Sequence, residues 1–322
     1  MKVILSHISA ARRLGIPNLD VVLGGAPGLG RADVSDITVL DGAQNIRRQG
    51  LRVHESKLPL PPGAVVAMDG ANVASPELVF LQLAPMLDMQ RLILLGLEIC
   101  SCPPGQPDRA LSTRQKLKAF LDKTPGHRGN KKSLRAAQFV GDGSGSVRES
   151  LAFMLLSLPP ALGGYGLGGA ALNGKIPLDE AGEELLSGNR DFASLYYADA
   201  KVAVDYRSRA ASCPPAEQGR AILRASILER RGVGVLQADP FLVYDPAAFR
   251  AFAFELARRL GRRPDLRAER FAQKHAALRS LLPERPARVL PHDFSPAPPR
   301  AFSPALSCAL PLEAAGAERA RG

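Results

Sequence analysis

The strongest constraint on the fold of this chain is a series of helix and strand segments within residues 143–263. In order, the segments are an apolar helix from Ser146, β-rich runs at 195–197 and 201–206, a basic helix at 214–231, a strand at 233–237 and a helix at 245–260. The two β-rich runs flank a short polar turn and therefore predict a β-hairpin. Helices that alternate with strands in this way predict an α/β domain.

The helices in this series have recognisable ends and apolar faces. Ser146 and Glu149 have the spacing of a capping box, Asp245 precedes a proline, and Gly261 follows the last helix. The apolar residues expected to face inward on the last two helices are Ile222, Leu223, Ile227, Leu228, Phe249, Phe252, Leu256 and Leu260. This spacing is typical of core packing and not of a cofactor pocket.

The segments GSGSVRES, LPPALGGYGLGGAALNGKI and SLYYADAKVAVDYRS, in this order, resemble the nuclease domain of very-short-patch-repair and PD-(D/E)-x-K endonucleases. The resemblance covers a little over a third of the chain. It implies a restriction-endonuclease-like domain over 139–263, with a central mixed sheet flanked by helices. It also implies Mg²⁺ as the cofactor of an active site, because Mg²⁺ held by carboxylates polarises a phosphate and activates water.

Several positions that carry the chemistry of this family differ here. The family's first-strand Asp is Ser194, its second-strand acid is Asp205, and the residue two positions later is Arg207. Arg207 shares a strand face with Asp205, competes with a cation for that carboxylate and cannot act as a base. Glu149 matches the acid on the family's first helix, or serves only its capping box. Asp191 is a candidate replacement ligand.

These changes favour a protein that binds nucleic acid through a degenerate nuclease-like domain, linked to defence or toxin-antitoxin regulation. Two alternatives are open. In the first, the protein is an active endonuclease in which Glu149, Asp205 and Asp191 hold Mg²⁺ while Arg207 stabilises the phosphate. In the second, it is an interaction protein that does not bind nucleic acid.

The charge of the chain agrees with a nucleic-acid partner. Lys and Arg number 42 against 31 Asp and Glu, which gives a formal net charge of +11. The densest basic run, at 111–138, is predicted to be a linker that contacts phosphates, DNA more than RNA, or else a solvated face. The candidate nucleic-acid-binding residues are Lys116, Lys118, Lys123, Arg128, Lys131, Lys132 and Arg135, together with Arg220 and Arg224 of the basic helix.

Residues 1–110 predict a small α+β domain. A strand at 64–68 is followed by a turn at 69–72 and by a helix that Ser75 begins. This stretch is similar to the carboxy-terminal part of abortive-infection antitoxin-like proteins, in which a small unit of this kind precedes a nuclease-like domain. His7 and His54 have no third partner in the sequence and are not predicted to form a site.

The remaining features predict no further chemistry. The four cysteines are too scattered for a disulfide framework or a zinc site, so we expect a reducing, cytoplasmic environment. No apolar run has the length of a membrane span. The glycine-rich run at 163–169 is a connection rather than a phosphate loop. Residues 264–322 are expected to hold one helix and then a proline-rich, mostly disordered tail.

Overall fold

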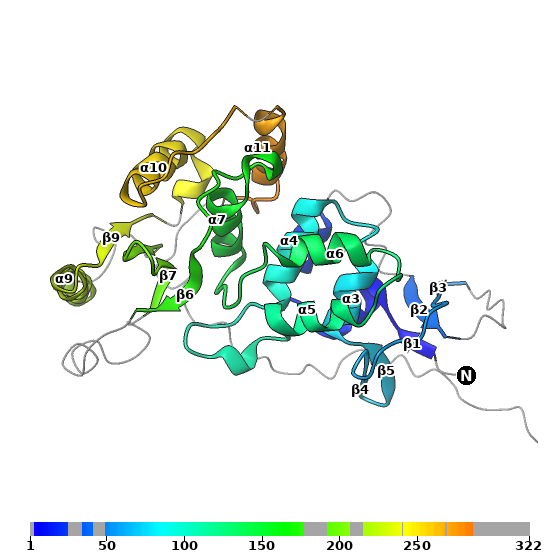
Figure 1. Cartoon of the computed structure of the whole chain (residues 1–322). Helices are drawn as coiled ribbons and strands as arrows, with labels where there is room; N and C mark the ends of the chain where they lie inside the picture. Colours follow the sequence, from blue (N-terminus) through cyan, green and yellow to red (C-terminus); the bar gives the residue numbers. More distant parts are fainter. Residues whose placement is uncertain are drawn as a thin grey trace, which may run out of the picture. The chain divides into compact units, whose positions relative to one another are not determined.

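The computed structural model describes residues 3–24, 34–40, 49–176, 192–206, 215–239, 241–267 and 269–285. All of these belong to one compact unit, Met1–Val289, which is shown in Figure 1. The unit is mixed α/β with two mixed sheets, which confirms the predicted α/β class. Among the described residues, no helix has the length and apolar content to cross a lipid bilayer. The predicted proline-rich tail beyond residue 285 lies outside the described part of the chain.

The first sheet has five strands in the order β3-β2-β1-β5-β4. The strands are β1 (Val3–Leu5), β2 (Ser35–Val39), β3 (Leu51–Glu55), β4 (Val65–Met68) and β5 (Ala71–Ala74). β1 lies at the centre, antiparallel to β2 and parallel to β5, and β2 pairs with β3 in parallel. Asp69 and Gly70 join β4 to β5 with φ of 47° and 74°, as a two-residue hairpin turn requires. The predicted strand and turn are confirmed.

Helices accompany the first sheet and supply most of its core. They are α1 (His7–Arg13), α2 (Leu19–Leu23), α3 (Pro76–Leu83) and α4 (Met89–Ile99). Ser75 Oγ accepts a hydrogen bond from Leu78 N (3.3 Å), as the sequence predicts, and Asp88 caps α4 through Arg91 N (2.9 Å). Leu92, Leu95 and Ile99 give α4 an apolar stripe that is fully buried.

Residues 111–138, expected as a basic linker, form two helices of the same body. These are α5 (Arg114–Asp122) and α6 (Asn130–Ala137), and they follow the short turn η1 (Pro107–Arg109). α5 contacts α3, α6 contacts α4, and the two helices contact each other. Leu117 and Leu121 of α5 are buried, so this segment contributes to the core and places its charged side chains outward.

The second sheet has four strands in the order β6-β7-β8-β9. The strands are β6 (Ala171–Lys175), β7 (Phe192–Tyr197), β8 (Val202–Asp205) and β9 (Gly234–Gln237). β6, β7 and β8 pair antiparallel, and β9 is parallel to β8. Helix α7 (Val147–Ser157) precedes β6, and α9 (Pro215–Arg230) connects β8 to β9, as parallel pairing requires. The predicted hairpin corresponds to β7 and β8.

The described chain ends in two helices, the second of which contacts α7. They are α10 (Pro246–Arg259) and α11 (Phe271–Arg279), and the short turns η2 (Pro160–Leu162) and η5 (Leu242–Tyr244) lie before them in sequence. Asp245 caps α10 through Ala247 N and Ala248 N, as predicted. The buried Gln90 amide of α4 donates to Leu162 O (2.9 Å) and Lys274 O (2.8 Å), and so ties α11 to the first half of the chain.

The inward face predicted for α9 is partly wrong. Leu228 is fully buried, but Ile222 and Leu223 are 66% and 44% exposed. The reason is that Arg224, only 4% exposed, lies one turn before Leu228 and sets the inward stripe of the helix with it. Ile222 and Leu223 are rotated away from that stripe.

Candidate functional site

Two of the positions that the nuclease resemblance singled out face each other on the two inner strands of the second sheet. Leu195 of β7 pairs with Val204 of β8, so Ser194 and Asp205, the next residues along the two strands, stand opposite each other. The Ser194 hydroxyl accepts a hydrogen bond from the backbone N–H of Tyr206 (3.2 Å). Both side chains are buried. The strand register therefore brings together the two positions that the family resemblance selected.

Asp205 forms a buried ion pair. Arg224 Nη1 of α9 donates to Asp205 Oδ2 over 2.7 Å, and the two side chains are only 5% and 10% exposed. Arg224 was predicted to contact nucleic acid. That assignment is corrected, because its guanidinium is buried and held by Asp205. The cation beside Asp205 comes from this helix, whereas the predicted neighbour Arg207 lies outside the described residues.

Glu149 lies in the first turn of α7 and belongs to the helix cap. Its N–H donates to Ser146 Oγ (3.3 Å), and its Oε2 accepts from Gly145 N (2.9 Å) and from Asn173 Nδ2 of β6 (3.4 Å). Burial raises the pKa of Tyr206, and Tyr197 and Glu149 raise it further, so this carboxylate lies near the end of β8. Of the two interpretations of Glu149, the capping role is the one that these hydrogen bonds support.

The described residues do not assemble the predicted magnesium site. Among them, no group of three His, Cys, Asp or Glu side chains could hold a metal ion. Glu149 is held by its helix cap and Asp205 by Arg224, while the third candidate, Asp191, lies outside the described residues. The donor set therefore does not fit Mg²⁺, which takes carboxylate and water oxygens without a competing guanidinium.

The predicted basic side chains largely lie on the outer faces of α5 and α6. Those that are exposed are Lys116, Lys118, Lys123, Arg128, Lys131 and Arg135. Lys132 is half-buried, and its Nζ donates to the backbone oxygen of Leu87. Because α5 and α6 contact each other, we call these exposed residues together the α5–α6 basic surface. The side chain of Arg220 lies outside the described set.

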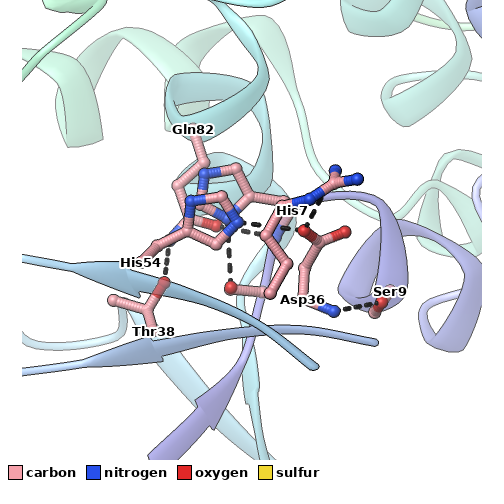
Figure 2. A network of polar contacts seen from close by, with 8 residues as sticks. His7, Ser9, Asp36, Thr38, His54 and Gln82 are labelled. Atoms are coloured by element: carbon pink, nitrogen blue, oxygen red, sulfur yellow. Dashed lines mark hydrogen bonds and ion pairs between the residues drawn. The ribbon is translucent and has the colours of Figure 1, made fainter. Parts of the chain in front are cut away.

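A polar network on the first sheet, absent from the sequence predictions, surrounds Asp36 (Figure 2). The parallel register of β2 and β3 places Arg52 beside Asp36 and His54 beside Thr38, on one face of the sheet. His54 Nε2 is 2.9 Å and Arg52 Nη1 is 3.5 Å from Asp36 Oδ1. The ring of His7 stacks on that of His54 with centroids 3.6 Å apart.

His7 of the stacked pair is held in its neutral form near neutral pH. Burial lowers the pKa of His7 to about 3, with a further lowering by His54 and a smaller opposing effect of Asp36. The His7 N–H donates to Gln82 Oε1 (3.0 Å), whose amide also donates to Thr38 Oγ1 (3.3 Å). The network therefore fixes α1 and α3 on the sheet. The sequence signal for it was the two-residue spacing of Arg52 and His54 on one strand.

A third polar group, Glu98 of α4, connects the two halves of the described chain. Its carboxylate accepts from Asn18 Nδ2 (2.7 Å) and from the hydroxyl of Ser150 of α7 (2.9 Å). Glu98 is 1% exposed, and burial raises its pKa to about 7. Neutral donors hold this carboxyl group, so its charge depends on pH near neutrality.

Comparison with known proteins adds no relative. No protein-family model, curated protein or solved structure matches the chain. The function must therefore be argued from the Asp205–Arg224 ion pair, the α5–α6 basic surface and the polar groups around them.

Proposed function

We propose that this protein binds nucleic acid and that its restriction-endonuclease-like domain does not cleave it. Support comes from the order α7, β6, β7, β8, α9, β9, which follows the order of segments expected from the family resemblance. A mixed four-stranded sheet flanked by helices is also what that resemblance implies. The observation that carries the proposal is the buried ion pair between Asp205 and Arg224.

The ion pair opposes metal catalysis for an electrostatic reason. Arg224 already supplies the positive charge that a metal ion would bring to Asp205, and Ser194 supplies no second carboxylate. A metal would have to displace a guanidinium that has almost no access to water, and leaving one partner of a buried pair uncompensated costs about 3–5 kcal/mol. A hydrolysis mechanism that uses one or two metal ions finds nothing at this site to offset that cost.

The α5–α6 basic surface provides the contact with nucleic acid. Its exposed Lys and Arg side chains lie on two helices that contact each other and on the segment between them, where each can neutralise a phosphate and release a counterion. Contacts of this kind carry no sequence information. We therefore propose duplex DNA as the partner and expect binding without sequence preference.

Plasmid cleavage tests the catalytic half of the proposal. Wild-type protein with Mg²⁺ or Mn²⁺ should leave supercoiled plasmid intact, and Asp205→Ala should change nothing in this assay. Nicking by the wild type that disappears in Asp205→Ala would instead establish the active endonuclease. A variant that combines Ser194→Asp, Asp205→Glu, Arg207→Lys and Arg224→Gln restores the acids and removes the competing cation, so it is the variant expected to nick.

Salt-dependent DNA binding tests the other half. Wild-type affinity should fall steeply between about 50 and 200 mM salt. Lys131→Glu with Arg135→Glu should weaken binding and reduce the slope of log K against log salt by about 2, one for each phosphate that the variant no longer neutralises. Arg267→Glu, at a side chain 93% exposed beyond α10, is the matched control and should change little. Binding that does not depend on salt would favour the interaction-protein alternative.

A further inference from the structure

An aromatic pair follows β9, close to the altered nuclease positions. The rings of Phe241 and Tyr244 stack with centroids 6.1 Å apart and an interplanar angle of 25°. The backbone fixes this pair, because Asp239 Oδ1 accepts from Phe241 N (2.8 Å) and Tyr244 N donates to Phe241 O (3.0 Å). Two half-buried aromatic side chains are therefore held in a preset orientation after the strand.

Two arginines share the ring of Phe241. The guanidinium carbons of Arg148, at the start of α7, and Arg285 lie 5.4 and 5.6 Å from the ring centroid. No carboxylate of the described residues forms an ion pair with either of them. A hydrogen bond to a charged group contributes more than a cation–π contact at an exposed site, so an oxyanion would hold these cations more strongly than the ring does.

The hydroxyl of Tyr244 adds a third donor. Its oxygen is buried and has no hydrogen-bond partner among the described residues. Burial raises the pKa of Tyr244, while Arg148 and Arg285 both act to lower it, which places both cations near this oxygen. Three donors with no carboxylate partner in the described part of the chain thus gather beside the aromatic pair.

The position of this cluster relative to the second sheet also favours ligand binding. Arg148 is adjacent to Glu149, and the chain reaches Phe241 directly after β9, where Ala238 N donates to Asp205 O (2.9 Å). The cluster therefore lies beyond the carboxyl ends of the parallel strands β8 and β9, the edge at which α/β sheets bind ligands.

We propose that Arg148, Phe241, Tyr244 and Arg285 bind a nucleotide of a single-stranded nucleic acid. The guanidiniums donate to one phosphate, and an adjacent base stacks on the planar guanidinium of the exposed Arg285 or on the aromatic pair. Single strands fit because the base faces in a duplex are already stacked on each other. The inference rests on the proposed function, since it assigns a second and different nucleic-acid contact to the same protein.

Fluorescence anisotropy with labelled oligonucleotides tests the assignment. The probes are a single strand of about twelve thymidines, within the span of known single-strand sites, and a duplex of the same length. Arg285→Gln and Phe241→Leu should each weaken single-strand binding about tenfold, because each removes a stacking or phosphate contact. Arg250→Gln removes a guanidinium that lies over Phe254, 5.6 Å from its centroid, and is the matched control. It should bind as the wild type does.

The outcomes separate this inference from the proposed function. Wild-type protein that binds neither probe overturns both. Wild-type protein that binds both probes, with Arg285→Gln and Phe241→Leu as tight as wild type, overturns the inference alone. Variants that lose equal affinity for the single strand and for the duplex also overturn it, because such losses would indicate a general phosphate contact. Arg285 is exposed, so its replacement keeps the test valid even if Phe241→Leu does not fold.

Discussion

Each of the two sheets places a buried aspartate beside an arginine, but only the second sheet encloses both partners. In the first sheet, Asp36 is 4% exposed while Arg52 is 37% exposed, with 3.5 Å between their nearest atoms. In the second, Asp205 and Arg224 are 10% and 5% exposed and 2.7 Å apart. A cation with access to water can be solvated when its partner is lost, whereas an enclosed one cannot. We therefore expect the fold to depend on the second pair and to tolerate the loss of the aspartate in the first.

The largest expected effect is the difference between the two aspartates. Asp205→Ala leaves Arg224 buried without its carboxylate and should lower the free energy of unfolding by about 3–5 kcal/mol. Asp36→Ala lets Arg52 turn to water and should cost about 1–2 kcal/mol. Urea unfolding followed by circular dichroism measures both. Equal losses would break the comparison, and Asp205→Leu with Arg224→Met should recover most of the first loss.

A second effect concerns the histidine stacked above Asp36. The pKa of His7 is lowered from 6.5 to about 3 in the folded protein. Below pH 6.5, His7 therefore binds a proton in the unfolded chain but stays neutral in the folded protein. Its contribution to stability is present above pH 6.5 and is lost as the pH falls toward 3, by up to about 4 kcal/mol. His7→Phe keeps a ring but removes this titration, so the difference between variant and wild type should change over that window. A constant difference would contradict the assignment.

Glu98 should show the opposite dependence. Its pKa is raised from 4.5 to about 7, so the folded protein keeps a proton that the unfolded chain loses. Its contribution to stability is present below pH 4.5 and falls by about 3 kcal/mol as the pH rises to 7. Glu98→Gln keeps the neutral form and should gain stability relative to wild type between pH 5 and pH 8, in urea midpoints. Parallel profiles for the two proteins would show that this carboxyl group is charged in the fold.

The smallest effect separates two neighbouring lysines of α6. Lys132 donates to the carbonyl oxygen of Leu87, so Lys132→Met should cost about 1 kcal/mol. Lys131 is exposed, and Lys131→Met should stay within about 0.5 kcal/mol of wild type. Thermal unfolding of the two variants compares them. Equal melting temperatures would mean that the Leu87 contact does not contribute to stability.

Local chemistry made the starts of several helices predictable. Ser75, Ser146 and Asp245 each accept a backbone hydrogen bond at the helix start where the sequence placed them. Such caps depend on residues within three positions of each other, which a sequence displays directly. The hairpin of the second sheet was predictable for the same reason, because its two strands flank one turn.

Pairings between distant residues could not be read from the sequence. Asp205 and Arg224 are on different elements, and only the packing of α9 turns Arg224 inward and Ile222 outward. His7 and His54 meet because β1 and β3 lie on either side of β2. In both cases tertiary contacts decided the orientation that helix or strand periodicity left open.

The central position of β1 has a consequence for synthesis on the ribosome. β1 is made before its parallel partner β5, which begins only at Ala71. At about 5–20 residues per second, the nascent chain carries one open strand edge for several seconds. During that time its unpaired backbone groups can join the strands of other nascent chains. Slower translation across residues 6–70 should therefore increase aggregation, whereas pauses after Ala74 should not.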